Sequence, residues 1–221
     1  MPADYDMALM QATHNALRRD LDHLARAAER LRPGDARGHE AMLLGWGTLK
    51  AMLGSHHDGE DRHMWPRMRA GLRDRPDDLA VLAAMEDEHA RIDPLIADVD
   101  AALANPSGPS GGDGGDGDAL AKAAHAFAGE VGGHLDHEER DALPLVRAAM
   151  PAAAWERCLA DMRGNGLAAL KSAPEFFPWL LGDALPADRA AVLRRVPPPV
   201  RLLYARVWLP RYARRPRWQA R

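Results

Sequence analysis

Four long segments repeat apolar residues at alternating steps of three and four, and this pattern constrains the fold more than any other feature. The segments run from about 4 to 31, 37 to 72, 77 to 104 and 118 to 150, and turns rich in Pro, Gly and Asp separate them. Such steps place the apolar side chains on one face of an α-helix, which must be buried against a partner. The sequence therefore predicts an all-α fold, an antiparallel up-down-up-down four-helix bundle over residues 1–150.

The rest of the chain, residues 151–221, has a different composition. Prolines break its helical stretches, and its last part holds nine arginines from Arg194 onward with no acidic residue. We expect an Arg/Pro-rich helical extension that packs on the bundle. Within the bundle, the Gly- and Ser-rich segment 105–117 is expected to be a flexible loop.

Polar residues interrupt each of the four apolar faces. The first and third helices each place one histidine there, and the second and fourth each place a histidine followed four residues later by a glutamate. An unpaired neutral polar group at a buried position costs roughly 2–7 kcal/mol, and a carboxylate costs more. These residues are therefore expected to belong to one functional site. They are His14, His56, Glu60, His89, His134 and Glu138.

The six residues also lie at matching distances from the expected turns. His14 lies 19 residues before Pro33, and His56 lies 21 residues after Asp35 on the next helix. Because an α-helix rises about 1.5 Å per residue, these two imidazoles reach one level of an antiparallel bundle. The same comparison holds for the other neighbouring helices, so all six side chains are expected to converge.

An internal repeat relates the second and fourth helices. Residues 56–70 and 134–148 align at an offset of 78 and share seven of fifteen residues. Both therefore carry a His-x-x-x-Glu pair, whose two side chains share a helix face. The repeat predicts a pseudo-twofold site that suits two metal ions side by side. Imidazole with carboxylate, and without thiolate, suits iron, manganese or zinc.

Five residues beside the apolar faces are candidates for a supporting role, in which they would hold ligand imidazoles in orientation. Solvated surface positions explain these residues nearly as well. A second register, in which His57 pairs with Asp61 and His137 pairs with Asp141, has the same spacing and stays open. The five candidates are His57, Asp61, Asp93, His137 and Asp141.

The order of the six residues resembles the hemerythrin-like family, the HHE cation-binding domains, over about residues 8–150. The resemblance implies a non-haem di-iron centre with an oxo or hydroxo bridge, in which Glu60 and Glu138 bridge the ions and the histidines cap them. Oxygen-carrying members resemble this chain but use two histidines four apart on the third helix, and five in all. Here Asp93 follows His89 at that spacing, which counts against reversible oxygen carriage.

The function expected from this site is binding of, or reaction with, O₂, peroxide or nitric oxide at two iron ions, with zinc or manganese as alternative metals. Peroxide decomposition of the catalase kind is one activity that such a site fits. Alternatively, the chain is an iron, oxygen or redox sensor that signals through its basic C-terminal segment. The arginines of that segment could contact phosphates of nucleic acid or of an anionic membrane. We favour the simpler interpretation that the segment folds back onto the acidic bundle.

Neither a signal peptide nor a membrane-spanning segment is expected from the sequence. No stretch approaches 18 uninterrupted apolar residues, and the N-terminal residues lack the apolar core of a signal peptide. The single cysteine, Cys158, excludes an intramolecular disulfide and any Cys-rich metal site. We therefore expect no transmembrane segment and a cytoplasmic location.

Overall fold

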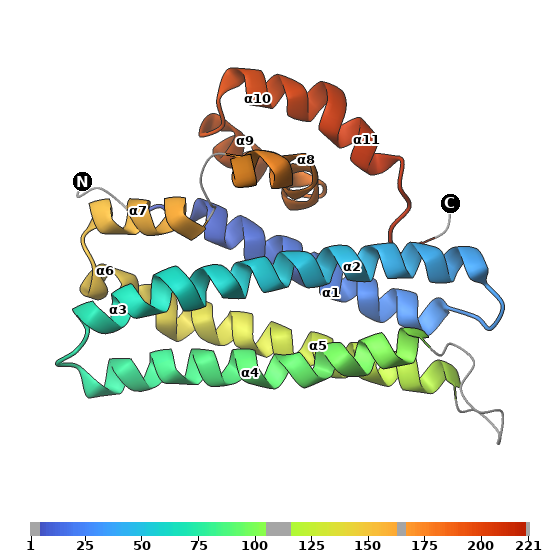
Figure 1. The fold of residues 1–221 in the computed structure, drawn as a ribbon, viewed down its shortest axis with the longest axis horizontal. Coiled ribbons are helices and arrows are strands. Elements are labelled where there is room, and N and C mark those ends of the chain that lie inside the picture. Colours follow the sequence, from blue (N-terminus) through green and yellow to red (C-terminus); the bar gives the residue numbers. More distant parts are fainter. Residues whose placement is uncertain (1–4, 105–115, 163–166, 220–221) are drawn as a thin grey trace.

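The fold is known from a computed structural model, which describes residues 5–104, 116–162 and 167–219. Every regular element in this part of the chain is helical, and none of its helices is long and apolar enough to cross a membrane. Figure 1 shows the long helical rods of the bundle lying side by side, with a smaller layer of helices on one side of them.

The first two rods come from the first third of the chain. Helix α1 (Ala8–Arg30) forms the first rod. The second consists of α2 (Ala36–Gly59), a π-helical turn η1 (Glu60–Met64) and α3 (Trp65–Gly71), which continue one another. Both rods match the helices expected from the sequence to within four residues.

Local chemistry explains the turn between the first two rods. Gly34 has a φ of +84°, a left-handed backbone conformation that glycine adopts easily because glycine has no Cβ. The carboxylate of Asp35 then caps α2 by accepting a hydrogen bond from the N–H of Gly38 at 2.9 Å.

The third and fourth rods follow in the same way. Helix α4 (Pro76–Ala104) is the third rod. The fourth joins α5 (Asp116–His137), the π turn η2 (Glu138–Ala142), the short 3-10 turn η3 (Leu143–Leu145) and α6 (Val146–Ala149). Both match the expected helices closely. Most of the loop expected over 105–117 lies outside the described residues.

Each π turn precedes a proline. In η1 and η2 the turn begins at the glutamate of the repeat, and the residue five positions on donates its N–H to the glutamate carbonyl. Pro66 and Pro144 follow these glutamates by six residues, and Pro210 follows the start of a third π turn, η4 (Tyr204–Trp208), by the same distance. Because proline cannot donate a backbone hydrogen bond and crowds the preceding turn, this spacing accounts for the π turns.

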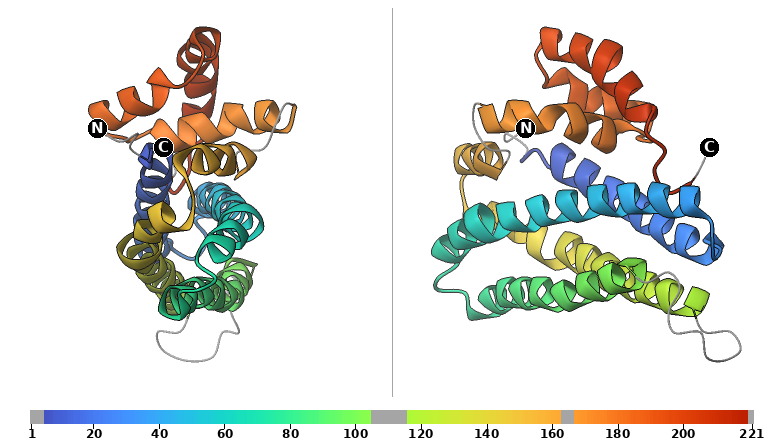
Figure 2. Two further views of the ribbon diagram at one scale, coloured as in Figure 1. Left: turned by 90° about the vertical axis from the view of Figure 1, so that its left-hand side faces the viewer. Right: turned by 45° about the vertical axis from the view of Figure 1, so that its right-hand side comes forward.

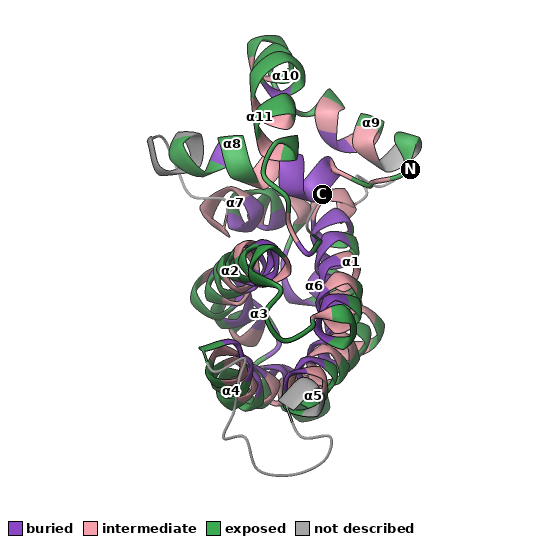
Figure 3. Cartoon of the chain, turned by 90° about the vertical axis from the view of Figure 1, so that its right-hand side faces the viewer, coloured by how far each residue is buried: buried purple, intermediate pink, exposed green. Residues whose placement is uncertain are grey.

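The four rods enclose a common core. Helix α1 packs on α2 and α5, and α4 packs on α5 and α2. The left view of Figure 2 and Figure 3 show the rods end on, and in Figure 3 the buried residues face the interior. The structure buries every expected inward position except Leu31, Ile96 and Leu145, which are half-buried.

A polar layer divides this core into two apolar clusters. One cluster contains Trp46 and lies toward the α1–α2 turn, and the other contains Trp65. The predicted ligands fall between the clusters along each rod. His14, for example, lies between Met10 of one cluster and Leu17 of the other. The predicted site is thus shielded from water by apolar side chains above and below it.

Helix α7 (Ala152–Met162) lies beyond the expected bundle boundary at residue 150 but shares the bundle core. It packs on α2 and η1, and it buries Trp155, Cys158 and Leu159 in the same cluster as Trp65. Cys158 is fully buried, and burial raises the pKa of its thiol. It therefore fills space as a small apolar side chain.

The remaining helices form a C-terminal layer, defined as α8 to α11 and the segment that follows to residue 219. Its helices α8 and α9 pack against α1. The last segment returns to α2, where the N–H of Trp218 donates to the carbonyl of Ala41 at 2.9 Å. The indole covers Gly45 so closely that a Cβ there would lie 2.4 Å from the ring. The elements are α8 (Leu167–Leu181), α9 (Pro186–Arg194), α10 (Pro198–Leu203), η4 (Tyr204–Trp208) and α11 (Leu209–Ala213).

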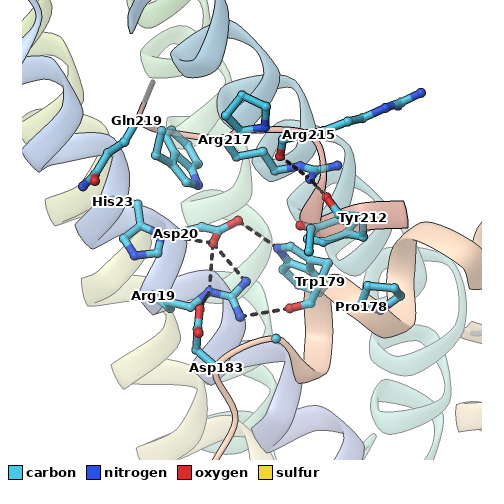
Figure 4. A pocket seen from close by; sticks show the side chains of 14 residues that line it. Arg19, Asp20, His23, Pro178, Trp179, Asp183, Tyr212, Arg215, Arg217 and Gln219 are labelled. Carbon is cyan, nitrogen blue, oxygen red and sulfur yellow. Dashed lines mark hydrogen bonds and ion pairs between the residues drawn. The ribbon is translucent and has the colours of Figure 1, made fainter. Parts of the chain in front are cut away.

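A pocket of about 390 Å³ lies where this layer meets α1 (Figure 4). Asp20 is buried in its wall, where it accepts a hydrogen bond from the indole N–H of Trp179 at 2.8 Å and pairs with Arg19 at 2.9 Å. Arg19 also donates to the carbonyl of Trp179. Arg19 balances the charge of the buried Asp20. The hydrogen bonds that Asp20 and Arg19 of α1 form with Trp179 of α8 connect the C-terminal layer to the bundle.

Candidate metal centre

The structure brings the six predicted ligands together at one level of the core. None of them is more than 8% exposed. The Nε2 atoms of His14 and His56 lie 3.1 Å apart, and the Nε2 atoms of His89 and His134 also lie 3.1 Å apart. Nitrogens from all four rods therefore point toward one another. The six residues are His14, His56, Glu60, His89, His134 and Glu138.

The potential ligand atoms divide into two groups of four, and within each group all atoms lie within 4.8 Å of one another. Glu60 belongs to both groups. The first group is His14, His56, Glu60 and Glu138. The second group is His57, Glu60, His89 and His134.

Glu60 lies between the two groups. Its Oε1 is 3.1 Å from Nε2 of His56, and its Oε2 is 3.6 Å from Nε2 of His89. One carboxylate can therefore serve two ions, one through each oxygen. Glu138 lies closer to the first group, with Oε2 at 3.1 Å from Nε2 of His14.

His57 lies among the candidate ligands rather than behind them. The residue is half-buried, but its Nε2 is buried and has no hydrogen-bond partner among the described residues. Its ring stacks on His89, with centroids 3.8 Å apart and planes 11° apart. Burial and the neighbouring His89 and His134 lower the pKa of His57 to about 2, so its ring is neutral, as a metal ligand must be. The cluster therefore contains five imidazoles.

Two buried glutamates in this cluster have imidazoles beside them but form no hydrogen bond among the described residues. All four carboxylate oxygens of Glu60 and Glu138 are buried and lack a hydrogen bond within the described chain. Burial and then the charge of Glu138 raise the pKa of Glu60 well above its usual range. Burial lowers the pKa of His14, but Glu138 and Glu139 outweigh it and raise that pKa to about 9. These residues fit metal ions, because cations would satisfy the orphaned oxygens and five nitrogen donors together.

Carboxylates behind the cluster orient three of the imidazoles. Each carboxylate accepts a hydrogen bond from the Nδ1–H of one imidazole, and this turns the Nε2 lone pair of that ring toward the centre of the cluster. Such partners also make the imidazole a stronger ligand. The pairs are His14 with Glu139 at 2.8 Å, His89 with Asp61 at 3.0 Å and His134 with Glu88 at 2.8 Å.

The other residues expected to support the site fall into different places. His137 lies one step further out, with Nδ1 at 2.7 Å from Glu88 and Nε2 at 3.3 Å from Asp141. Asp93 is exposed, and no described contact joins it to the cluster. The pairing of His137 with Asp141 in the second register does occur, but neither residue enters a ligand group.

Two orienting carboxylates, Glu88 and Glu139, were not expected from the sequence. Glu139 aligns with Asp61 in the repeat, since each directly follows the glutamate of its turn. The repeat could therefore have identified it. Hydrogen bonds from His14 and Arg18 lower the pKa of Glu139 to about 2 and keep it ionised. Glu88 reaches His134 from a different helix, so only the packing of α4 on α5 reveals its role.

Comparison with known proteins agrees with this geometry. A family model, the hemerythrin HHE cation-binding domain, matches residues 6–146. The matched range contains every residue of both ligand groups, and the C-terminal layer lies beyond it. Comparisons with curated proteins and with solved structures gave no match. Since the family model covers well over half of the chain, the protein belongs to the hemerythrin HHE cation-binding family.

Proposed function

We propose that this chain holds two iron ions in the bundle core and uses them to bind, or react with, a small ligand such as O₂, peroxide or nitric oxide. One observation carries the proposal. Among the described residues, the four buried carboxylate oxygens of Glu60 and Glu138 have no hydrogen-bond partner, and they face five imidazoles. Without cations this arrangement is costly, and with them it becomes a ligand set.

The two positions would have different ligands. His14, His56 and Glu138 would hold the first ion. The second would be held by His57, His89 and His134, again through imidazole nitrogens. Glu60 would bind both ions, one through each oxygen. Zinc or manganese would suit the same donors, so the identity of the metal is part of the proposal.

The chain's own residues would prepare the site for a small ligand. Two iron ions, if held by these residues, would supply the electrons for reaction with such a ligand. Apolar residues of both clusters, such as Leu53, Met85, Ile92 and Phe127, lie along the rods on either side of the ligand layer and exclude water. The orienting carboxylates Asp61 and Glu139 keep two imidazoles fixed while a ligand binds. Carriage, sensing and peroxide decomposition all remain compatible with this arrangement.

His57 changes one expectation about oxygen. The argument against reversible carriage rested on a set of four histidines. With His57 as a ligand the set has five, the fifth coming from α2 rather than from α4. Carriage therefore returns as a candidate activity. The proposal includes an up-down-up-down order of the four rods, because that order brings the histidine-bearing turns to one level. It also includes a cytoplasmic location.

Elemental analysis of protein purified from iron-replete cells tests the proposal. We expect about two iron ions per chain and a change in near-ultraviolet absorbance when peroxide is added. His56→Ala should lose metal, whereas His125→Ala, at an exposed position outside both ligand groups, should keep it. Protein that carries no transition metal, or that carries the same amount in both variants, contradicts the proposal.

A further inference from the structure

A cationic and apolar surface lies on the outermost helical stretch of the C-terminal layer, from α10 to α11 (Figure 1). Tyr204 is buried and faces the interior of the layer. Three large apolar side chains of the same stretch are instead exposed: Leu202 by 60%, Leu203 by 46% and Val207 by 46%. Val207 lies one turn after Leu203, so these two side chains are neighbours on the helix surface, and Leu202 directly precedes Leu203 in the chain.

This concentration of exposed apolar side chains is unusual for the molecule. Among the described residues, only two other large hydrophobic side chains are exposed, Leu43 on α2 and Leu185 before α9. Single exposed leucines are ordinary in proteins, but three exposed apolar side chains within six residues of one helical stretch indicate a contact surface.

Exposed arginines share this stretch of the chain with the three apolar side chains. Arg206, Arg211, Arg214 and Arg215 are exposed, and none of them forms an ion pair within the described chain. No acidic residue follows Asp188 in the sequence. The segment folds back onto the bundle, but its described ion pairs involve Arg195 with Asp6 and Arg217 with Glu175. Most of its positive charge is left for a partner.

A second pocket, of about 280 Å³, opens beside Val207. Lys171, Arg211 and Arg215 contribute cationic side chains to its walls, and Trp208 and Tyr212 contribute aromatic ones. Glu175 also lines it but is paired with Arg217 at 3.4 Å. An anionic group of phosphate size therefore fits next to the exposed apolar side chains.

We propose that this surface, Leu202, Leu203 and Val207 with Arg206, Arg211 and Arg214, docks on an anionic lipid bilayer. The apolar side chains would enter the headgroup boundary, and the arginines would lie at the level of the phosphates. A nucleic acid would use the arginines but would leave the apolar side chains in water. The juxtaposition of both kinds of side chain on one helix is what selects the bilayer.

Co-sedimentation of the full chain with vesicles tests this proposal. We expect binding to phosphatidylcholine vesicles that contain phosphatidylglycerol, weakening as salt rises, and no binding to phosphatidylcholine alone. Arg206→Gln, Arg211→Gln and Arg214→Gln together should weaken binding about 100-fold, at about fivefold for each charge near the surface. The matched triple variant Arg62→Gln, Arg73→Gln and Arg140→Gln removes three exposed arginines of the bundle and should bind as the unaltered chain does.

A second pair of variants tests the apolar part of the surface. Leu202→Ser should weaken vesicle binding by about tenfold, and Leu43→Ser, at the exposed leucine of α2, should leave it unchanged. Thermal unfolding of all variants should stay unaltered, because these side chains are exposed. Absence of binding to phosphatidylglycerol vesicles overturns the proposal, as do equal losses in the two arginine triple variants. Binding to duplex DNA that is insensitive to Leu202→Ser overturns it in favour of a nucleic acid.

Discussion

The two His-x-x-x-Glu turns of the bundle are alike in backbone and unlike in what they supply. Both begin a π turn at the glutamate, and both place an acidic residue directly after it. In the first turn that acid is Asp61, which orients His89, and in the second it is Glu139, which orients His14. Each turn thus holds an imidazole from a helix that contributes a single histidine.

The difference lies one residue after each histidine. The first turn has His57 there, whose Nε2 enters a ligand group, and the second has Leu135, which is fully buried in an apolar cluster. The first turn therefore offers three potential ligands and the second offers two. The repeat thus coincides with two groups of potential ligands that differ in their donors: two imidazoles and two carboxylates in one, three imidazoles and one carboxylate in the other.

The largest expected effect separates the two glutamates. Glu60→Gln should abolish binding of both ions, because Glu60 alone belongs to both ligand groups. Glu138→Gln should retain about one ion, since Glu138 belongs to the first group only. Elemental analysis after exhaustive iron loading measures the difference, with circular dichroism to verify folding. Equal losses in the two variants would mean that both glutamates bridge and that the positions are equivalent.

The next effect concerns the position at which the repeat breaks. His57→Leu copies the second turn into the first and should reduce bound metal from about two ions to about one per chain, since it removes a donor of the second group. The control His125→Leu changes an exposed histidine outside both groups and should keep two. If His57→Leu also keeps two ions with unchanged affinity, His57 has only the supporting role expected from the sequence.

Smaller effects are expected from the orienting carboxylates. Asp61→Asn and Glu139→Gln should each weaken metal affinity about 10- to 100-fold without changing the number of ions, since each removes the Nδ1 acceptor of one imidazole. Metal titration against a competing chelator measures both. Asp93→Asn, at an exposed position, provides the control and should have no effect. A loss in that control equal to the other two would contradict the assigned roles.

The smallest effect is the pH dependence of the metal-free protein. The pKa of His14 is raised to about 9 from the ordinary value of 6.5, so its stabilising contribution is complete below pH 6.5 and is lost as pH rises toward 9. The raised pKa of Glu60 likewise makes the stability of the folded state fall as pH rises. The lowered pKa values of His56 and His57 instead reduce stability below pH 6.5.

Denaturant unfolding of metal-free protein should therefore show maximum stability near pH 6.5 and a decline in stability as pH rises toward 9. Metal-loaded protein should lack the decline, because bound cations keep the glutamates ionised and His14 neutral. A decline of the same size in both forms would place its origin outside the cluster.

Much of this site could be predicted from the sequence, because helical periodicity decides which side chains face the core. His14, His56 and His134 each lie on an apolar face, so their convergence follows from the spacing of the turns. His57 lies one step off that face and enters the site only because α2 runs beside the cluster. Glu88 lies on α4 and accepts a hydrogen bond from His134 on α5, and no pattern within one helix predicts such a contact.

The C-terminal layer was less predictable for a related reason. The sequence indicates short helices and an excess of arginine, and it favours pairing of that charge with the acidic bundle. The structure instead leaves Arg206, Arg211 and Arg214 without ion pairs in the described chain. Which arginines meet an acid depends on the orientation of α10 and α11, which Tyr204 and Trp218 fix by burying their rings.

Anomalous diffraction at the iron absorption edge, from crystals of the iron-loaded chain, tests the central claim most directly. The claim is that two unlike positions share Glu60, one beside His14 and His56 and the other beside His57, His89 and His134. We predict two anomalous peaks, one on each side of the Glu60 carboxylate, with His57 bound to the second. A single peak, or a second peak that His57 does not contact, would contradict it.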